Sequence, residues 1–248
     1  MTMEKSKVRM LYEACSAVLS EKKLPNFKQV LWLRDLLDTF EANDVGIDEL
    51  GSPKENKGLI CPQGIKEITY IHIYECDDFS IGVFCFPAGA SFPLHDHPGM
   101  TVFSKLLYGS VYVKAYDWAK VFNSSPNKTC KNFVTFGLAT KVRDGILRAP
   151  CESSVIFPRS GGNIHAFTAL TPCAILDVLT PPYSDELGRP STYFADFPIS
   201  SLPGYALLEE RDLPNDLVVR GAPYVGPPIG ADEDDNLCLT QITNSDQE

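Results

Sequence analysis

The sequence predicts a mainly β fold, either a sandwich or a barrel, with a pair of helices packed on its outside. Two observations indicate this fold class. Between about residues 65 and 180, short runs rich in β-branched and aromatic residues follow one another, with turn residues but no helical pattern between them. This arrangement is typical of a sandwich or barrel and not of a doubly wound sheet. Two patterns with the period of an amphipathic helix precede the runs, within residues 1–43.

The two helical patterns differ in how clearly their ends are marked. The first joins apolar residues from Val8 to Leu19 at a spacing of about 3.6 residues. The second begins at Asn26, a favourable N-cap with Gln29 at the capping-box position, and runs to Phe40. Each helix has one apolar face that must be buried against another element. We therefore expect both helices to cover the outside of the β structure; a helical hairpin that binds a partner is the alternative.

The strand candidates are separated by turns and two longer loops. Tyr108-Gly109-Ser110 has the composition of a hairpin turn, and Asp144-Gly145 carries the Asp-Gly hairpin signal. Residues 44–64 are expected to form a connecting loop, and residues 123–128 an exposed loop. The expected strands cover residues 68–74, 81–86, 101–108, 110–116, 133–136, 140–143, 154–157, 164–170 and 174–179.

The length of the chain favours one domain. At 248 residues it can bury one sizeable core. We expect a single domain over residues 1–230, made of the helical segment 1–43, a barrel core over 65–180 and an irregular, Pro-rich segment over 181–230. Residues 231–248 include Asp232-Glu233-Asp234-Asp235 and are expected to form a disordered acidic tail.

Composition and charge exclude several classes of partner. The net charge is −10 without a basic stripe, which argues against direct binding of nucleic acid. No apolar segment follows the basic residues of Met1–Lys7, and no apolar run approaches the length of a membrane span, so neither a signal peptide nor a membrane partner is expected. The eight cysteines contain no CxxC pair. They indicate reduced thiols in the cytoplasm or nucleus.

Two histidines one residue apart mark a candidate metal site. His95 and His97 follow apolar residues, and in a β-strand residues i and i+2 point to the same face. We therefore expect both imidazoles to face one ion. Five residues separate Gly89 from His95, and eleven separate His97 from Gly109. This spacing resembles the first motif of the cupin superfamily, which implies a double-stranded β-helix, or jelly-roll, barrel.

The cupin motif also places a glutamate ligand shortly after the second histidine. Here that segment has no acid and includes Thr101, Val102 and Phe103. The sequence therefore predicts a metal site without a carboxylate ligand.

The third ligand is nearly a forced choice, since the chain has four histidines. His165 follows a Gly-rich turn and begins an apolar strand, as in the second cupin motif, although it lies seven residues after Pro158 and not five. His72 alternates with Tyr70 and Tyr74 and is expected to be packed or solvent-facing. We therefore predict His165 as the third ligand.

Three neutral imidazoles indicate a particular chemistry. On a six-coordinate ion they leave three positions open, and the higher positive charge of such a centre suits an anionic thiolate. A substrate with a thiol and an amine would leave one position for dioxygen, and the product would be a sulfinic acid. Three histidines also hold catalytic zinc, so the ligand set alone does not decide the metal.

Most of the chain resembles the plant cysteine oxidases, which are relatives of animal 2-aminoethanethiol dioxygenase. The most specific stretches are residues 92–100, 109–118, 161–165 and 175–183. The resemblance implies a cupin-like fold and iron(II) held by His95, His97 and His165. It implies that O2 oxidises the N-terminal cysteine of target proteins, notably ethylene-response transcription factors, to cysteine sulfinic acid. Arginylation and degradation by the N-degron pathway would follow, in the cytoplasm and nucleus, as part of the hypoxia response. We expect a monomer.

The resemblance also implies two catalytic residues. By position, Asp177 and Tyr183 match an acid and a phenol that line the family's substrate pocket. A carboxylate within the apolar run 173–179 is costly to bury unless paired, and a substrate ammonium, Arg148, Arg159 or a backbone turn could be its partner. Tyr183 could act as an acid or base, orient a group, or pack. Ser191 stands where some relatives have a cysteine, which argues against a thiol-derived cofactor there.

Three functions of different classes follow from these observations. The first is a dioxygenase of protein N-terminal cysteine. The second is another cupin enzyme, acting on free cysteine or cysteamine or using zinc or manganese. The third is a binding or storage module, against which the open coordination positions argue. The surroundings of the site discriminate between substrates: a protein N-terminus needs an open groove, and a free amino acid needs a closed pocket with an arginine for its carboxylate.

Overall fold

The structure is a computed structural model that describes residues 5–19, 25–47, 66–119, 136–215 and 217–229. The loop expected at 123–128, most of the loop expected at 44–64, and the tail expected at 231–248 lie outside these residues. The helices are α1 (Lys7–Val18), α2 (Phe27–Asp38) and the short 3-10 helix η1 (Ala42–Val45). The strands are β1 (Ile68–Glu75), β2 (Ser80–Phe86), β3 (Ser91–His95), β4 (Thr101–Tyr108), β5 (Ser110–Trp118), β6 (Phe136–Arg148), β7 (Ser154–Ile156), β8 (Ile164–Ala169), β9 (Cys173–Thr180), β10 (Tyr193–Pro198), β11 (Tyr205–Arg211) and β12 (Val219–Ala222).

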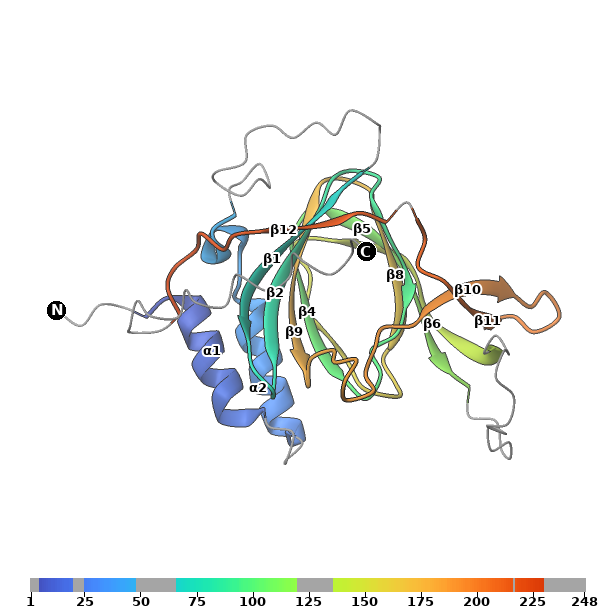
Figure 1. The fold of residues 1–248 in the computed structure, drawn as a ribbon, viewed down its shortest axis with the longest axis horizontal. Helices are drawn as coiled ribbons and strands as arrows, with labels where there is room; N and C mark the ends of the chain where they lie inside the picture. Colours follow the sequence, from blue (N-terminus) through green and yellow to red (C-terminus); the bar gives the residue numbers. More distant parts are fainter. Residues whose placement is uncertain (1–4, 20–24, 48–65, 120–135, 216, 230–248) are drawn as a thin grey trace, which may run out of the picture.

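The strands form two groups that face each other around the interior of a barrel (Figure 1). One is a six-stranded sheet with the order β12-β1-β2-β9-β4-β7. The other is a closed ring with the order β10-β11-β6-β5-β8-β3, in which Tyr193 of β10 pairs with His95 of β3. All strand pairs are antiparallel except β1 with β12. The predicted mainly β, cupin-like barrel is confirmed.

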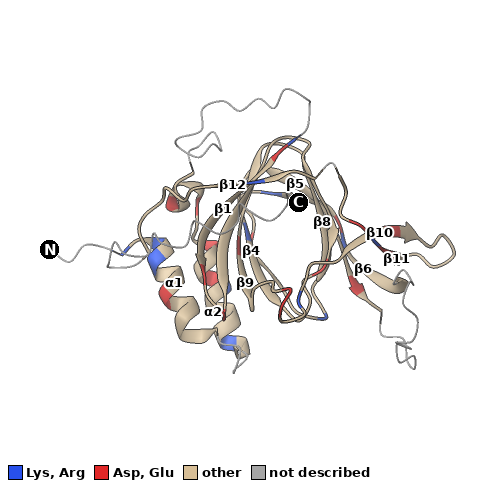
Figure 2. Cartoon of the chain, in the orientation of Figure 1, with Lys and Arg blue, Asp and Glu red and all other residues tan. Residues whose placement is uncertain are grey.

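The two helices lie against the outer face of the β1-β2-β9-β4 sheet, as the sequence predicts (Figure 1). Leu11 of α1 and Leu37 of α2 are fully buried and belong to one apolar cluster with Ile73, Val83 and Leu176 of the sheet. The capping box at the start of α2 is present, since Asn26 and Gln29 each accept a hydrogen bond from the backbone N–H of the other. Both helices also carry acidic and basic residues (Figure 2).

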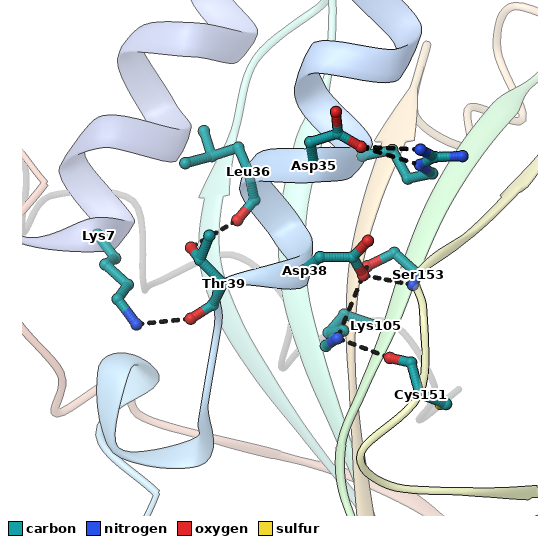
Figure 3. Close-up of polar contacts among 9 residues, drawn as sticks. Lys7, Asp35, Leu36, Asp38, Thr39, Lys105, Cys151 and Ser153 are labelled. Carbon is teal, nitrogen blue, oxygen red and sulfur yellow. Dashed lines mark hydrogen bonds and ion pairs between the residues drawn. The ribbon is translucent and has the colours of Figure 1, made fainter.

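A buried ion pair fastens α2 to the barrel (Figure 3). The ammonium group of Lys105 on β4 lies 3.2 Å from Asp38 Oδ1 and donates to the carbonyl oxygen of Cys151 at 2.7 Å. The same Asp38 oxygen accepts hydrogen bonds from the backbone N–H and the hydroxyl of Ser153. Because the Lys105 side chain is only 8% exposed, this carboxylate is the counter-charge that its burial requires.

Three local predictions are wrong. Asp144-Gly145 is not a hairpin turn: β6 runs through it, and Asp144 and Gly145 pair with residues of β5. Gly109 does turn the chain, with φ 82°, but β4 and β5 do not pair there and enter different sheets. The segment 181–230 is not irregular throughout, since β10 to β12 lie within it and complete both groups of strands.

The geometry of the two neighbouring histidines also differs from the expected strand. His95 is the last residue of β3, and His97 lies beyond its end, before a turn in which Gly99 has φ 71°. Alternation within one strand therefore does not bring them together. Within the part of the chain that is described, no helix is both long and apolar enough to cross a membrane.

Candidate metal centre

The structure brings His95, His97 and His165 together inside the barrel. Their potential ligand atoms all lie within 4.8 Å of one another, and their ring centroids are 4.7 to 5.0 Å apart. All three side chains are buried. His72, the fourth histidine, has a side chain that is 47% exposed and does not belong to this group.

Strand pairing places two of the three histidines. His165, the second residue of β8, is the direct cross-strand partner of His95 on β3. An irregularity in the pairing between Phe92 and His95 precedes this contact. The predicted Gly-rich turn before His165 is present, with φ of 88° and 87° at Gly161 and Gly162. A left-handed backbone of this kind favours glycine, which explains the two glycines at this point.

Asn163 holds His97, the histidine that strand pairing does not place. The sequence analysis did not single out Asn163. The amide oxygen of Asn163 accepts a hydrogen bond from the backbone N–H of His97, and its amide nitrogen donates to the His97 carbonyl, both at 3.0 Å. Asn163 is positioned in turn by Asp117, whose Oδ1 accepts hydrogen bonds from the backbone N–H groups of Gly162 and Asn163. Asn163 lies 66 positions from His97 and 46 positions from Asp117, so no local sequence pattern predicts these contacts.

Backbone carbonyls orient the imidazole rings. His95 Nδ1 lies 2.9 Å from the carbonyl oxygen of Pro93, and His97 Nδ1 lies 3.0 Å from that of Asn163. A carbonyl can only accept, so each Nδ1 carries the proton and each Nε2 keeps its lone pair for another partner. Metal-binding histidines are commonly held in this way.

The electrostatics of the three rings fit a cation. Burial lowers the pKa of His95 to about 3 and that of His97 to about 4, and it lowers the pKa of His165 well below its ordinary value. The rings are therefore neutral at pH 7 and need not lose a proton before binding an ion. Three neutral, buried imidazoles make a donor set that suits iron, zinc and copper. The residues thus fit a divalent transition metal.

A cavity of about 370 Å³ opens beside the three histidines. Its apolar wall is mostly aromatic, and its polar groups are few, as in small-molecule sites. Its wall carries two carboxyl groups, those of Glu75 and Asp177, and no lysine or arginine is among the described residues that line it. The remaining lining residues are Tyr70, Ser80, Phe84, Phe86, Phe92, Phe167, Ile175, Leu179, Pro182, Tyr183, Ser191 and Tyr193.

Asp177 faces this cavity without a full set of partners. Its Oδ1 atom is buried and has no hydrogen-bond partner among the described residues. Burial raises the pKa of Asp177 to about 7, and a hydrogen bond with Ser104 opposes this only in part. Neither Arg148 nor Arg159 contributes to this pKa. An unpaired carboxylate oxygen in such a place indicates a missing donor, such as a bound ammonium group.

Tyr183 is tied to the backbone between the two neighbouring histidines. Its hydroxyl donates a hydrogen bond to the Asp96 carbonyl at 2.7 Å, and its ring lies 5.6 Å from that of His97. Burial raises the pKa of the phenol, so it stays protonated. Of the alternatives left open for Tyr183, this contact favours an orienting hydroxyl. Ser191 also lines the cavity, and its hydroxyl is buried.

Comparison with known proteins identifies the family. The PCO_ADO family model matches residues 36–229, well over half of the chain. The chain belongs to the PCO_ADO family. It is 40% identical to plant cysteine oxidase 1 of Arabidopsis thaliana, over 90% of this chain and 80% of that protein. It is 32% identical to 2-aminoethanethiol dioxygenase of Mus musculus, over 89% of this chain and 95% of that protein.

Membership of the PCO_ADO family confirms the expected resemblance and the expected enzyme class, a thiol dioxygenase. Among solved structures, KdgF from Halomonas sp. matches at 17% identity with a TM-score of 0.32, over 48% of this chain and 83% of that one. An RmlC-like cupin from Shewanella frigidimarina matches at 15% identity with a TM-score of 0.31, over 46% of this chain and 77% of that one.

In this PCO_ADO member, all five residues predicted for the site line one cavity. They are His95, His97, His165, Asp177 and Tyr183. Three further residues of functional interest escaped the sequence analysis as site residues, namely Asn163, Tyr70 and Glu75. Tyr70 and Glu75 are five positions apart on β1, so strict alternation would place them on opposite faces. A register shift in the pairing with β2, between His72 and Tyr74, lets both line the cavity.

Proposed function

We propose that this protein is an iron(II)-dependent dioxygenase that adds both atoms of O2 to the thiol of an N-terminal cysteine of target proteins. In this reaction the S–H and O–O bonds break and two S–O bonds form. The sulfur gives up the four electrons that O2 takes up, and the thiol proton passes to the sulfinate or to solvent. The product is cysteine sulfinic acid. The 40% identity to plant cysteine oxidases 1 and 2 of Arabidopsis thaliana supports cysteine as the substrate class.

One observation carries the choice of substrate: the cavity wall carries two carboxyl groups, those of Glu75 and Asp177. Free cysteine would bring a carboxylate, whose burial needs a cation. No lysine or arginine is among the described residues that line the cavity. A peptide with an N-terminal cysteine brings a thiol and an ammonium group but no carboxylate at that residue, so it complements this wall.

Each group of the cavity has a separate task in this proposal. His95, His97 and His165 would hold the iron(II), which when bound supplies the redox chemistry that lets O2 react with a thiol. The Oδ1 atom of Asp177 would accept a hydrogen bond from the substrate ammonium and so orient the cysteine. Tyr183 would fix the backbone that carries His97 through its bond to Asp96. The aromatic wall would keep water away from the sulfur.

The proposal extends to the fate of the product. The sulfinic acid would mark the target for arginylation and degradation by the N-degron pathway, so that oxygen supply sets the lifetime of the target. Ethylene-response transcription factors would be substrates, and the enzyme would act as a monomer in the cytoplasm and nucleus during the hypoxia response. The resemblance to the plant cysteine oxidases supports this extension.

A second candidate function is oxidation of a small thiol. Cysteamine has a thiol and an ammonium group and no carboxylate, so the acidic cavity also complements it. The 32% identity to 2-aminoethanethiol dioxygenase of Mus musculus favours this alternative. Free cysteine fits less well, because its carboxylate would lie near Asp177 without a counter-charge.

Mass spectrometry of iron-loaded protein in air would separate these candidates. The substrates are a peptide with N-terminal cysteine, its N-acetylated form, free cysteine and cysteamine. We expect the free-N-terminus peptide to gain two oxygen atoms, and the acetylated peptide, which lacks the ammonium group, to remain unchanged. Oxidation of cysteamine but not of the peptide would establish the second candidate. Equal oxidation of the acetylated peptide would remove the role proposed for Asp177.

A further inference from the structure

Glu75 lines the same cavity as Asp177 but lies where the cavity meets solvent. It is the last residue of β1, and its side chain is 52% exposed. The Oε2 atom of Glu75 lies 4.0 Å from Nδ1 of His72. Glu75 thus brings a negative charge to the mouth of the cavity.

The strand register fixes how far Glu75 lies from Asp177. Glu75 pairs with Ser80 of β2, which pairs with Leu179 of β9. Asp177 lies two residues before Leu179 on the same strand. Two residues along a strand span about 7 Å, and two strand spacings span about 9.6 Å. The Cα atoms of Glu75 and Asp177 are therefore about 12 Å apart across the sheet.

Tyr70 shows that both carboxylates border the same part of the cavity. Its ring lies against the backbone of Gly82. A Cβ atom placed on Gly82 would come within 2.5 Å of the Tyr70 hydroxyl oxygen. Gly82 is the direct cross-strand partner of Asp177. Burial raises the pKa of Tyr70 to about 12, and the charges of Glu75 and Asp177 both add to this effect. Tyr70 therefore lies within the field of both acids.

A peptide held by its N-terminus would pass Glu75 on its way out of the cavity. With its ammonium group at Asp177, the next two residues of an extended chain cover at most about 7 Å of the 12 Å to Glu75. The remaining distance of about 5 Å is within reach of the long side chain of lysine or arginine. The second or third residue of the substrate is thus placed to bring a positive charge to Glu75.

We propose that Glu75 is a specificity-determining residue that selects peptide substrates with lysine or arginine at the second or third position and disfavours acidic residues there. This inference rests on the proposed function, because it needs a peptide whose N-terminus enters the cavity. It concerns the chain beyond the oxidised cysteine, and Glu75 takes no part in the reaction at sulfur.

Peptides that differ only at one position would test the selection. We would measure kcat/KM for otherwise neutral peptides that begin Cys-Ala-Ala, Cys-Lys-Ala, Cys-Ala-Lys and Cys-Glu-Ala. For the wild type, one lysine peptide should exceed the glutamate peptide about fivefold, as a partly exposed ion pair allows. This preference should shrink as salt concentration rises. Equal values for all four peptides would overturn the inference and leave the proposed function standing.

Variants of Glu75 make the test specific. Glu75→Gln should bring the lysine-to-glutamate ratio of kcat/KM close to one. Glu75→Lys should reverse the preference. The matched control is Glu13→Gln, since Glu13 is a partly exposed glutamate of α1 that pairs with Lys5 and Arg9 on the outside of the protein. It should keep the wild-type ratio; a control that loses the preference would mean that net charge, and not Glu75, causes it.

A binding measurement separates failure of this inference from failure of the proposed function. Peptides that begin Ser-Lys-Ala, Ser-Ala-Lys and Ser-Glu-Ala have no thiol, and their dissociation constants can be measured without turnover. We expect one of the lysine peptides to bind about fivefold more tightly than the glutamate peptide, and Glu75→Gln to abolish the difference. If cysteine peptides are not oxidised but this difference is present, the proposed function fails and the selection by Glu75 stands. If cysteine peptides are oxidised and the difference is missing, the proposed function stands and the selection by Glu75 fails.

Discussion

Asn163 holds His97 through three hydrogen bonds. Its side-chain amide bridges the backbone N–H and the carbonyl of His97, and its own carbonyl oxygen lies 3.0 Å from His97 Nδ1. The asparagine is 6% exposed, so water cannot easily replace it. Because His97 lies beyond the end of β3, this amide takes the place of the strand pairing that positions His95 and His165.

Replacing Asn163 should therefore weaken metal binding. Asn163→Ala removes both side-chain bonds to His97, and loss of such an outer contact typically lowers metal affinity by about 10–100-fold. Asn163→Asp keeps the acceptor but loses the donor. Its metal affinity should lie between those of the wild type and Asn163→Ala. Competition with a chromogenic chelator measures the affinity. The exposed Asn43, far along the chain in η1, provides the control Asn43→Ala, which should bind metal as the wild type does.

The sequence predicted the histidines of this site but not their support, for a physical reason. His95 and His97 are recognisable because their spacing is local, and His165 because few histidines compete with it. The role of Asn163 depends on a contact between residues 66 positions apart. The prediction that alternation within one strand brings His95 and His97 together is wrong, because the chain leaves β3 after His95.

His165 and His72 give a direct test of the third ligand. His165→Ala should abolish stoichiometric metal binding and activity, because two imidazoles alone hold a divalent ion weakly. His72→Ala should retain both, since its side chain is 47% exposed and lies outside the three-histidine group. Metal content after gel filtration, measured by mass spectrometry of the elements, checks both variants. Loss of metal in the His72 variant together with retention in the His165 variant would show that the assignment is wrong.

The part of the fold that sequence reasoning missed is the part that depends on sheet closure. Asp144-Gly145 is a strong hairpin signal, yet cross-strand pairing with β5 keeps β6 extended through it. The segment 181–230 has many prolines, but Tyr193 pairs with His95 and closes the ring of strands. Local propensity predicts a turn or a loop in both places, and long-range pairing overrides it.

Asp177 should make stability depend on pH. Its pKa is raised from 3.8 to about 7 by burial, so the folded protein keeps this proton while the unfolded chain has already lost it. Between about pH 4 and pH 7 the free energy of unfolding contributed by this group therefore falls as pH rises, by up to a few kcal/mol. Asp177→Asn lacks the effect. In metal-free protein its melting temperature should exceed that of the wild type by a margin that grows from pH 5 to pH 7.5 and then levels off.

The same substitution separates stability from function. Asp177→Asn should retain the metal, because the three clustered histidines that would hold the metal are unchanged. The substitution should lower kcat/KM for a cysteine peptide by at least about tenfold, because it removes the carboxylate that orients the ammonium group. The exposed Asp212 provides the control Asp212→Asn, which should change neither property. Unchanged kinetics in the Asp177 variant would reduce this residue to a structural role.

Two aspartates of α2 should differ in their effect on stability, although they lie three residues apart (Figure 3). Asp38→Ala leaves the ammonium group of Lys105 buried without a counter-charge and removes two bonds to Ser153, and removing one partner of a buried pair typically costs about 3–5 kcal/mol. Asp38 itself is 29% exposed, so we expect the lower end, about 3 kcal/mol. Asp35→Ala, whose side chain is 63% exposed, should cost less than about 0.5 kcal/mol. Urea unfolding measures both, and equal costs would show that the pair does not fasten α2 to the barrel.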